Sequence, residues 1–237
     1  MSEVEIVENI SLKKKEYSVI IGLAGTTVVG NTALMYIART KRFKKIAHLK
    51  SWHIPPMMIL ADGEAFPPFR IYIDETSDVL LVITESPISA EGSYPVAASL
   101  FKWLLEKGMK ELYCVEVLPV GGLSSNVKAL SYSNKIDLTK YGIIQAREGA
   151  IAGIPACLME ECLKRDIPFA TIFIPITRLV AMDYGATASV VEVLNLIFKF
   201  GVDSSPLRQT DEGIKKALDQ QQQQQQKGGI GRVLNRR

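Results

Sequence analysis

The sequence predicts a three-layer α/β domain with a mainly parallel central sheet, and two observations lead to this prediction. Short runs of continuous apolar sequence, rich in β-branched residues, have the length of strands that are covered on both faces. Segments of helical character lie between these runs, and such alternation is typical of a sheet sandwiched between helices. A chain of 237 residues buries a substantial core. We therefore expect one domain at residues 1–207 and a separate tail at residues 208–237.

Four apolar runs supply the central strands, and segments between them supply helices. The strands are expected at residues 17–23, 79–84, 112–118 and 169–175. The helices are expected at residues 31–43, 93–108 and 153–166. Gly108 stands where a glycine commonly ends a helix, directly before the next strand.

The region 45–75 differs from the rest of the domain. It holds two Pro-Pro pairs, an Asp62-Gly63 turn signal and short alternating runs. These features indicate hairpin-like decoration of the main sheet, at an edge or an interface. Residues 127–133 also alternate and are a further strand candidate.

The last helix of the domain, expected at residues 184–201, is apolar nearly all round. A helix of this kind is buried from more than one side. In a chain of this size the second side suits another subunit, so we expect a homo-oligomer.

The tail differs from the domain in composition. Seven glutamines at residues 220–226 precede a Gly-rich basic end, and such a segment cannot bury enough apolar surface to order itself, so we expect a flexible tail. The tail holds seven Lys/Arg and three Asp/Glu and so carries +4, which leaves the domain near −1 of the net +3. The domain therefore lacks the basic face that a phosphate backbone requires, and we expect no nucleic-acid partner.

Membrane insertion, secretion and metal binding are not expected. No stretch reaches the ~18 uninterrupted apolar residues of a membrane helix. The N-terminus has acids first and lysines later, the wrong order for a secretory signal, which favours the cytoplasm. Cys114, Cys157 and Cys162 form no C-x-x-C pair, so we expect reduced, buried thiols and no structural zinc.

Residues 22–32, GLAGTTVVGNT, have part of the spacing of a nucleotide-binding loop. Gly25, Gly30 and Thr32 fit the pattern G-x-x-x-x-G-K-[ST], but Asn31 stands at the lysine position. Asparagine is neutral and too short to follow a phosphate as lysine does. The glycines also let the chain turn sharply and the helix start close to the sheet. Binding of an anion at the N-terminus of that helix is the alternative role for this turn.

No reactive constellation is visible in the sequence. The chain lacks the G-x-S-x-G pattern of nucleophilic hydrolases. Glu148, in a glycine-containing loop before a helix, is a candidate acid/base or ribose ligand, although exposed loop carboxylates are common. The absence of a reactive constellation favours a binding or assembly protein without a cofactor over an enzyme. The alternative is a nucleotide- or nucleoside-binding enzyme, ligase-like or phosphorylase-like, that uses residues 22–32 and Glu148.

Three segments together resemble the proteasome assembly chaperone 2 (PAC2) family in its archaeal form. They are GLAGTTVVGNTALMYIA after the first strand, EGAIAGIPACLMEECLKRDI before the strand at 169, and MDYGATASVVEVLNLIFKFGVD near the end of the domain. The residues that match the last element are Asp183, Ala186, Ala188, Val191, Leu194, Val202 and Asp203. The resemblance spans about residues 15–207, and the order and spacing of the segments carry it.

The resemblance implies a fold similar to nucleoside phosphorylases, self-association, and a role in helping proteasome α subunits assemble. Some family members end with a hydrophobic residue, a tyrosine and one last residue, and this tail inserts between α subunits. Here the penultimate residue is Arg236. A tail with Arg232, Leu234, Arg236 and Arg237 would instead suit an acidic patch on the partner.

Overall fold

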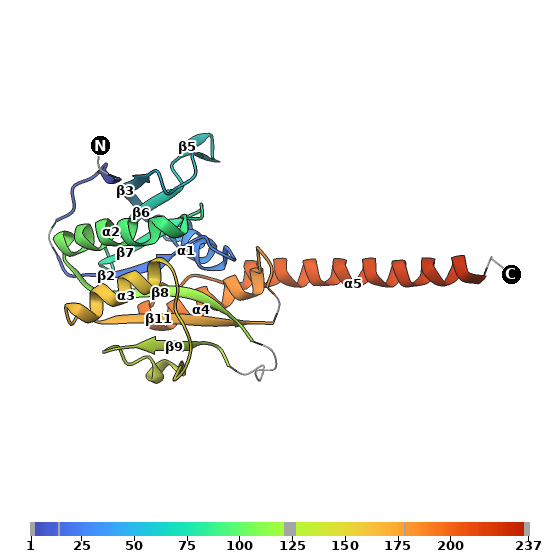
Figure 1. Cartoon of the computed structure of the whole chain (residues 1–237). Coiled ribbons are helices and arrows are strands. Elements are labelled where there is room, and N and C mark those ends of the chain that lie inside the picture. The colour runs from blue at the N-terminus through green and yellow to red at the C-terminus, as the bar shows by residue number, and fades with distance from the viewer. Residues whose placement is uncertain (1–2, 14, 121–126, 178, 235–237) are drawn as a thin grey trace.

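The computed structural model describes residues 3–13, 15–120, 127–177 and 179–234 (Figure 1). The strands are β1 (Val4–Glu8), β2 (Tyr17–Gly22), β3 (Lys44–Ser51), β4 (Ile59–Ala61), β5 (Glu64–Phe66), β6 (Phe69–Asp74), β7 (Val79–Thr84), β8 (Met109–Pro119), β9 (Leu130–Ser133), β10 (Ile144–Gln145) and β11 (Phe169–Ile176). The helices are α1 (Val29–Thr40), α2 (Ser93–Lys107), α3 (Ile154–Lys164), α4 (Tyr184–Phe198) and α5 (Ser205–Leu234). Short 3₁₀ turns occupy residues 90–92 and 139–141.

Within the described ranges, nine strands form one sheet in the order β1-β3-β6-β7-β2-β8-β11-β9-β10. The four strands in the middle, β7, β2, β8 and β11, run parallel to one another. They are the four runs that the sequence predicts as central strands, and every residue of β2 and β7 is buried. Their continuous hydrophobicity therefore reflects cover on both faces, as expected.

The α/β class is confirmed, but the sheet is mixed where the sequence predicts a mainly parallel one. At one edge β1, β3 and β6 all pair antiparallel with their neighbours, and beyond β11 the strand β9 is also antiparallel. The turn between β6 and β7 spans only residues 75–78, which is too short for the crossover that parallel strands need. The region 45–75 thus decorates the sheet edge, as predicted, and its β4–β5 hairpin turns at Asp62 and Gly63.

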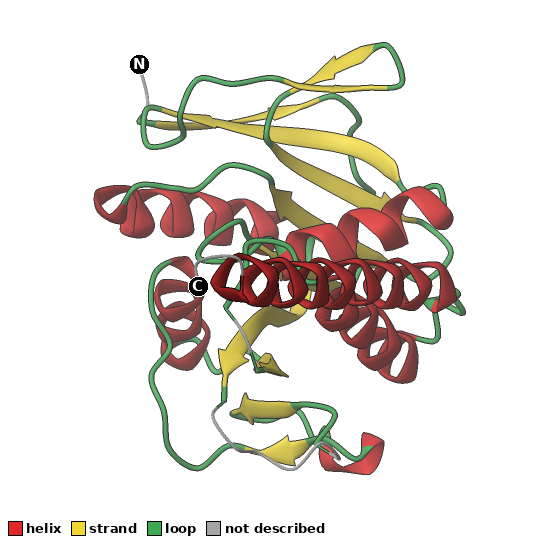
Figure 2. Ribbon diagram, turned by 90° about the vertical axis from the view of Figure 1, so that its right-hand side faces the viewer, coloured by secondary structure: helices red, strands yellow, loops and turns green. Residues whose placement is uncertain are grey.

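Helices cover both faces of the sheet and give three layers (Figure 2). On one face α1 and α4 contribute buried side chains such as Leu34 and Leu194 to a common apolar core. On the other face α2 and α3 do the same with side chains such as Leu100 and Leu158. Gly108 ends α2 in the left-handed conformation, φ 95°, which confirms the expected glycine cap.

The apolar helix α4 is covered from more than one side within the same chain. It packs on β11, against α1 and against the start of α5. Asp183 caps its N-terminus, because the Ala186 backbone N–H donates to the Asp183 carboxylate at 2.8 Å. Beyond its first turns α5 extends away from the domain as one helix (Figure 1). The boundary at residue 207 and the flexibility of the tail stay predictions.

Candidate functional site

The glycine-rich turn joins β2 to α1 by close backbone packing. A Cβ atom at Gly22 would lie 2.8 Å from the carbonyl oxygen of Gly30. A Cβ atom at Gly30 would lie 3.0 Å from the carbonyl oxygen of Val115 on β8. Gly22 and Gly30 therefore let β2, α1 and β8 approach one another. This is the role that the sequence predicts for the glycines of the turn.

Asn31, at the position of the phosphate-binding lysine, points into the protein. The residue is 3% exposed, and its Nδ2 donates to the carbonyl oxygen of Thr84 at 3.0 Å. This bond ties the first turn of α1 to the end of β7. Thr32 is half-buried in the same turn. Asn31 therefore holds the turn in place, and the ligand role of both residues stays a prediction.

A cavity of about 570 Å³ opens beside this turn, at the carboxyl ends of β2, β8 and β11. Two of the predicted ligand residues, Gly25 and Gly30, line it. Asn31, Thr32 and Glu148 are not among its lining residues, and Glu148 lies exposed on the loop before α3. The structure thus brings the glycines of the turn to a concave surface but leaves Glu148 outside it.

Glu116 is a functional candidate that the sequence analysis did not identify. It lies on β8 in the wall of the cavity, and its register partner on β11 is Phe173. Burial raises the pKa of its carboxyl group from 4.5 to about 7. The signal in the sequence is an acid inside the otherwise apolar strand LYCVEVL, where a carboxyl group has a desolvation cost.

Large apolar side chains are exposed on the segment 52–60, which follows β3 and continues into β4. Trp52 is 82% exposed and Leu60 is 81% exposed. Met57 and Met58 on the same segment are also exposed. We call residues 52–60 the apolar segment. Clustered exposed side chains of this kind, with Trp and Met among them, are typical of protein contact surfaces.

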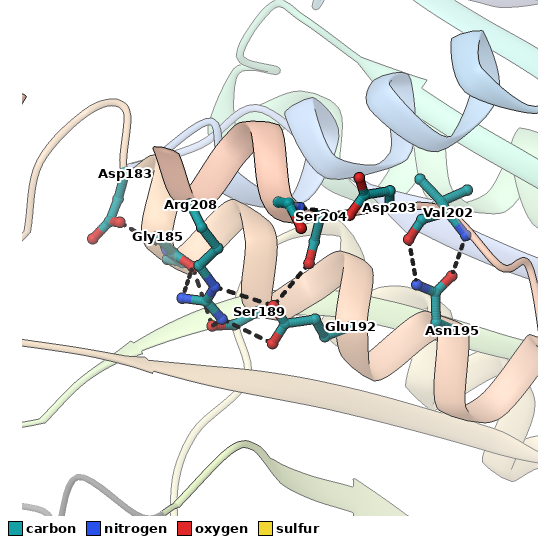
Figure 3. A network of polar contacts seen from close by, with 11 residues as sticks. Asp183, Gly185, Ser189, Glu192, Asn195, Val202, Asp203, Ser204 and Arg208 are labelled. Carbon is teal, nitrogen blue, oxygen red and sulfur yellow. Dashed lines mark hydrogen bonds and ion pairs between the residues drawn. The ribbon is translucent and has the colours of Figure 1, made fainter. Parts of the chain in front are cut away.

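A polar network fastens α5 to α4 (Figure 3). Arg208 on α5 donates to both carboxylate oxygens of Glu192 and to the carbonyl oxygen of Gly185. Ser204 donates to the same carboxylate at 2.9 Å. Burial tends to raise the pKa of Glu192, but the hydrogen bonds from Arg208 and Ser204 outweigh it and lower the pKa. The base of α5 is therefore anchored to α4.

The predicted partner-binding residues lie at the far end of α5 or beyond it. Arg232 and Leu234 fall in the last turns of the helix. Arg236 and Arg237 lie outside the described residues. Their partner role stays a prediction.

Across the part of the chain that the structure describes, no group of three or more His, Cys, Asp or Glu side chains is placed to hold a metal ion. Among those same residues, no helix combines the length and the apolar character needed to cross a membrane.

Comparison with known proteins places the chain in a family. The model of the PAC2 family matches residues 19–222. The chain belongs to the PAC2 family. A protein of unknown function from Thermoplasma acidophilum is 30% identical, over 91% of this chain and 91% of that chain, with a TM-score of 0.72. A search of curated proteins finds no match.

Two further solved structures share the fold of this PAC2 family member. PbaA from Pyrococcus furiosus, described as an archaeal homolog of proteasome-assembly chaperone, is 21% identical over 96% of this chain and 95% of its own, with a TM-score of 0.83. PbaB from the same organism, described as an archaeal proteasome activator, is 18% identical over 94% of this chain and all of its own, with a TM-score of 0.79. The likeness to nucleoside phosphorylases stays a prediction.

Proposed function

We propose that this PAC2 family protein self-associates and binds proteasome α subunits in the cytoplasm to assist their assembly, without catalysing a reaction. The observation that carries the proposal is the family match over residues 19–222. The fold supports the proposal, because the structural match extends over nearly the whole length of both PbaA and PbaB. The two proteins are described as a homolog of proteasome-assembly chaperone and as a proteasome activator.

The apolar segment is the surface that we assign to the proteasome subunit. Trp52 and Leu60 are more than four-fifths exposed, so they contribute little to the folded core and are available to a partner. Tryptophan is enriched among the residues that dominate binding energy, and methionine adapts to irregular surfaces. Burial of such side chains against an α subunit would supply the hydrophobic driving force for association.

The experiment mixes the purified protein with proteasome α subunits from the same cell and follows complexes by native gels and sizing chromatography, with and without ATP. We expect a complex that forms equally well without ATP. Sizing of the protein alone should give a mass above that of one chain. No complex, together with thermal stabilisation of the protein by ATP, would favour the nucleotide-binding enzyme instead.

Variants locate the contact surface. Trp52→Ser and Leu60→Ser should fold normally, because both side chains are exposed, and should weaken the complex with α subunits at least tenfold. Leu163→Ser on α3 is the matched control, since Leu163 is also an exposed leucine, at 46%. Full binding by the Trp52 and Leu60 variants would remove the apolar segment from the proposal.

A further inference from the structure

The cavity beside the glycine-rich turn lies where α/β sheets commonly bind small molecules. The connection after β2 enters α1 on one face of the sheet, and the connection after β7 enters α2 on the other face. Crevices at the carboxyl ends of strands whose connections diverge in this way are common ligand sites. The volume of about 570 Å³ lies within the usual range for such sites.

The wall of this cavity is mainly apolar. Ile88, Ile151, Phe173 and Leu179 contribute large apolar side chains, while glycines and alanines of the two loops leave room between them. Among the described residues that line the cavity, Glu116 is the only ionisable one. The described part of the lining therefore offers one carboxyl group in mainly apolar surroundings.

The carboxyl group of Glu116 needs a partner when it is ionised. Burial raises its pKa, and within the described ranges it forms no ion pair. An ionised carboxylate in such a place is costly unless a positive charge or hydrogen-bond donors compensate it. A phosphate or another anion would be repelled by the same group. The electrostatics of the cavity thus favour a cation.

We propose that this cavity binds a small organic amine, whose ammonium group pairs with the carboxylate of Glu116 and whose apolar body packs against Ile88 and Phe173. The inference is independent of the proteasome proposal. Among the described residues, the ionisable group that interacts with Glu116 is the Cys114 thiol, two residues earlier on β8, and burial keeps this thiol neutral. At acid pH, protonation of the Glu116 carboxyl group should therefore weaken binding of the amine.

The test measures binding of 2-phenylethylamine to the full chain by titration calorimetry and ligand-observed NMR, at pH 8 and at pH 6. Its neutral isostere 2-phenylethanol is measured in parallel. We expect the amine to bind more tightly at pH 8 than at pH 6 and at least tenfold more tightly than the alcohol at pH 8. Glu116→Gln should weaken amine binding at least tenfold, whereas Glu106→Gln, at an exposed glutamate on α2, should not change it.

A second variant narrows the cavity and leaves Glu116 itself unchanged. Ala152 lines the cavity and is exposed, so Ala152→Trp should fold and should abolish amine binding. Circular dichroism and thermal unfolding check that each variant is folded. Absence of amine binding at millimolar concentration would overturn the proposal, as would equal binding of amine and alcohol or full binding by folded Glu116→Gln or Ala152→Trp protein.

Discussion

Arg208 of α5 and Glu192 of α4 form a two-point ion pair, with Nε to Oε1 at 3.1 Å and Nη2 to Oε2 at 2.8 Å. The same guanidinium group also donates to the Ser189 hydroxyl and to the Gly185 carbonyl oxygen. Planar two-point pairing fixes orientation as well as distance. The contact therefore sets the direction in which α5 leaves the domain.

Arg208→Met should loosen α5 from α4 without unfolding the domain. Both side chains of the ion pair are more than 40% exposed, so the free energy of unfolding should fall by about 1 kcal/mol or less. Hydrogen exchange of amides 205–212 should rise much more than exchange in β2. Lys216→Met, at an exposed position of the same helix, is the control. Unchanged exchange at residues 205–212 would show that α5 is held by other contacts.

Gly22→Ala should destabilise the protein by about 1–3 kcal/mol, because the added methyl group overpacks the junction of β2 and α1. Its Cβ would lie 2.8 Å from the Gly30 carbonyl oxygen and 2.9 Å from Leu34 Cδ1. Gly25→Ala, three residues later, is the matched control, since its Cβ would meet no atom within 4 Å. Urea unfolding measures both. Equal midpoints for the two variants would mean that the backbone shifts freely.

The middle of the sheet could be predicted from the sequence, and its edge could not. Runs such as 79–84 are apolar at five of six positions, so they indicate strands covered on both faces. In β3, by contrast, Lys44, Lys45 and Lys50 interrupt the apolar residues, and its pairing with β1 and β6 depends on contacts between distant residues. Edge strands with charged, half-exposed sequences carry a weaker pattern than central strands.

The candidate site was only partly predictable for the same reason. The turn at Gly25 and Gly30 is visible in the sequence because glycine spacing is a local signal. The cavity exists only after the ends of three strands come together, which no local pattern records. The Arg208–Glu192 contact likewise joins residues 16 positions apart on two different helices. Sequence patterns predict elements, while sites depend on how those elements are packed.

Removal of residues 221–237 should weaken binding to proteasome α subunits, and the difference from the full chain should grow as salt is lowered. The segment carries Lys227, Arg232, Arg236 and Arg237 and no acid, and attraction between such a tail and an acidic patch is screened by salt. This truncation leaves Arg208 and its contacts with α4 intact. A full-length variant with the four basic residues changed to glutamine is the control and should behave like the truncation. Equal affinities of truncated and full-length protein at low salt would exclude a role for the tail charges.

Glu116 should make the protein less stable as pH rises. The carboxyl group has its ordinary pKa of 4.5 in the unfolded chain, and burial raises the pKa to about 7 in the folded protein. Between these two values the folded state binds more protons than the unfolded state, so stability falls as pH rises through this window.

At about 1.4 kcal/mol for each pKa unit, the loss reaches up to about 3 kcal/mol above pH 7. Glu116→Gln removes the titration, because glutamine is neutral at every pH. The variant should therefore differ least from the wild-type protein at pH 5, and the gain in its free energy of unfolding over the wild type should be largest at pH 8. Urea unfolding at one-unit steps from pH 5 to pH 8 measures the difference, with Glu106→Gln as the exposed control. Parallel pH profiles for the wild-type protein and Glu116→Gln would show that the carboxyl group is solvated in the folded state.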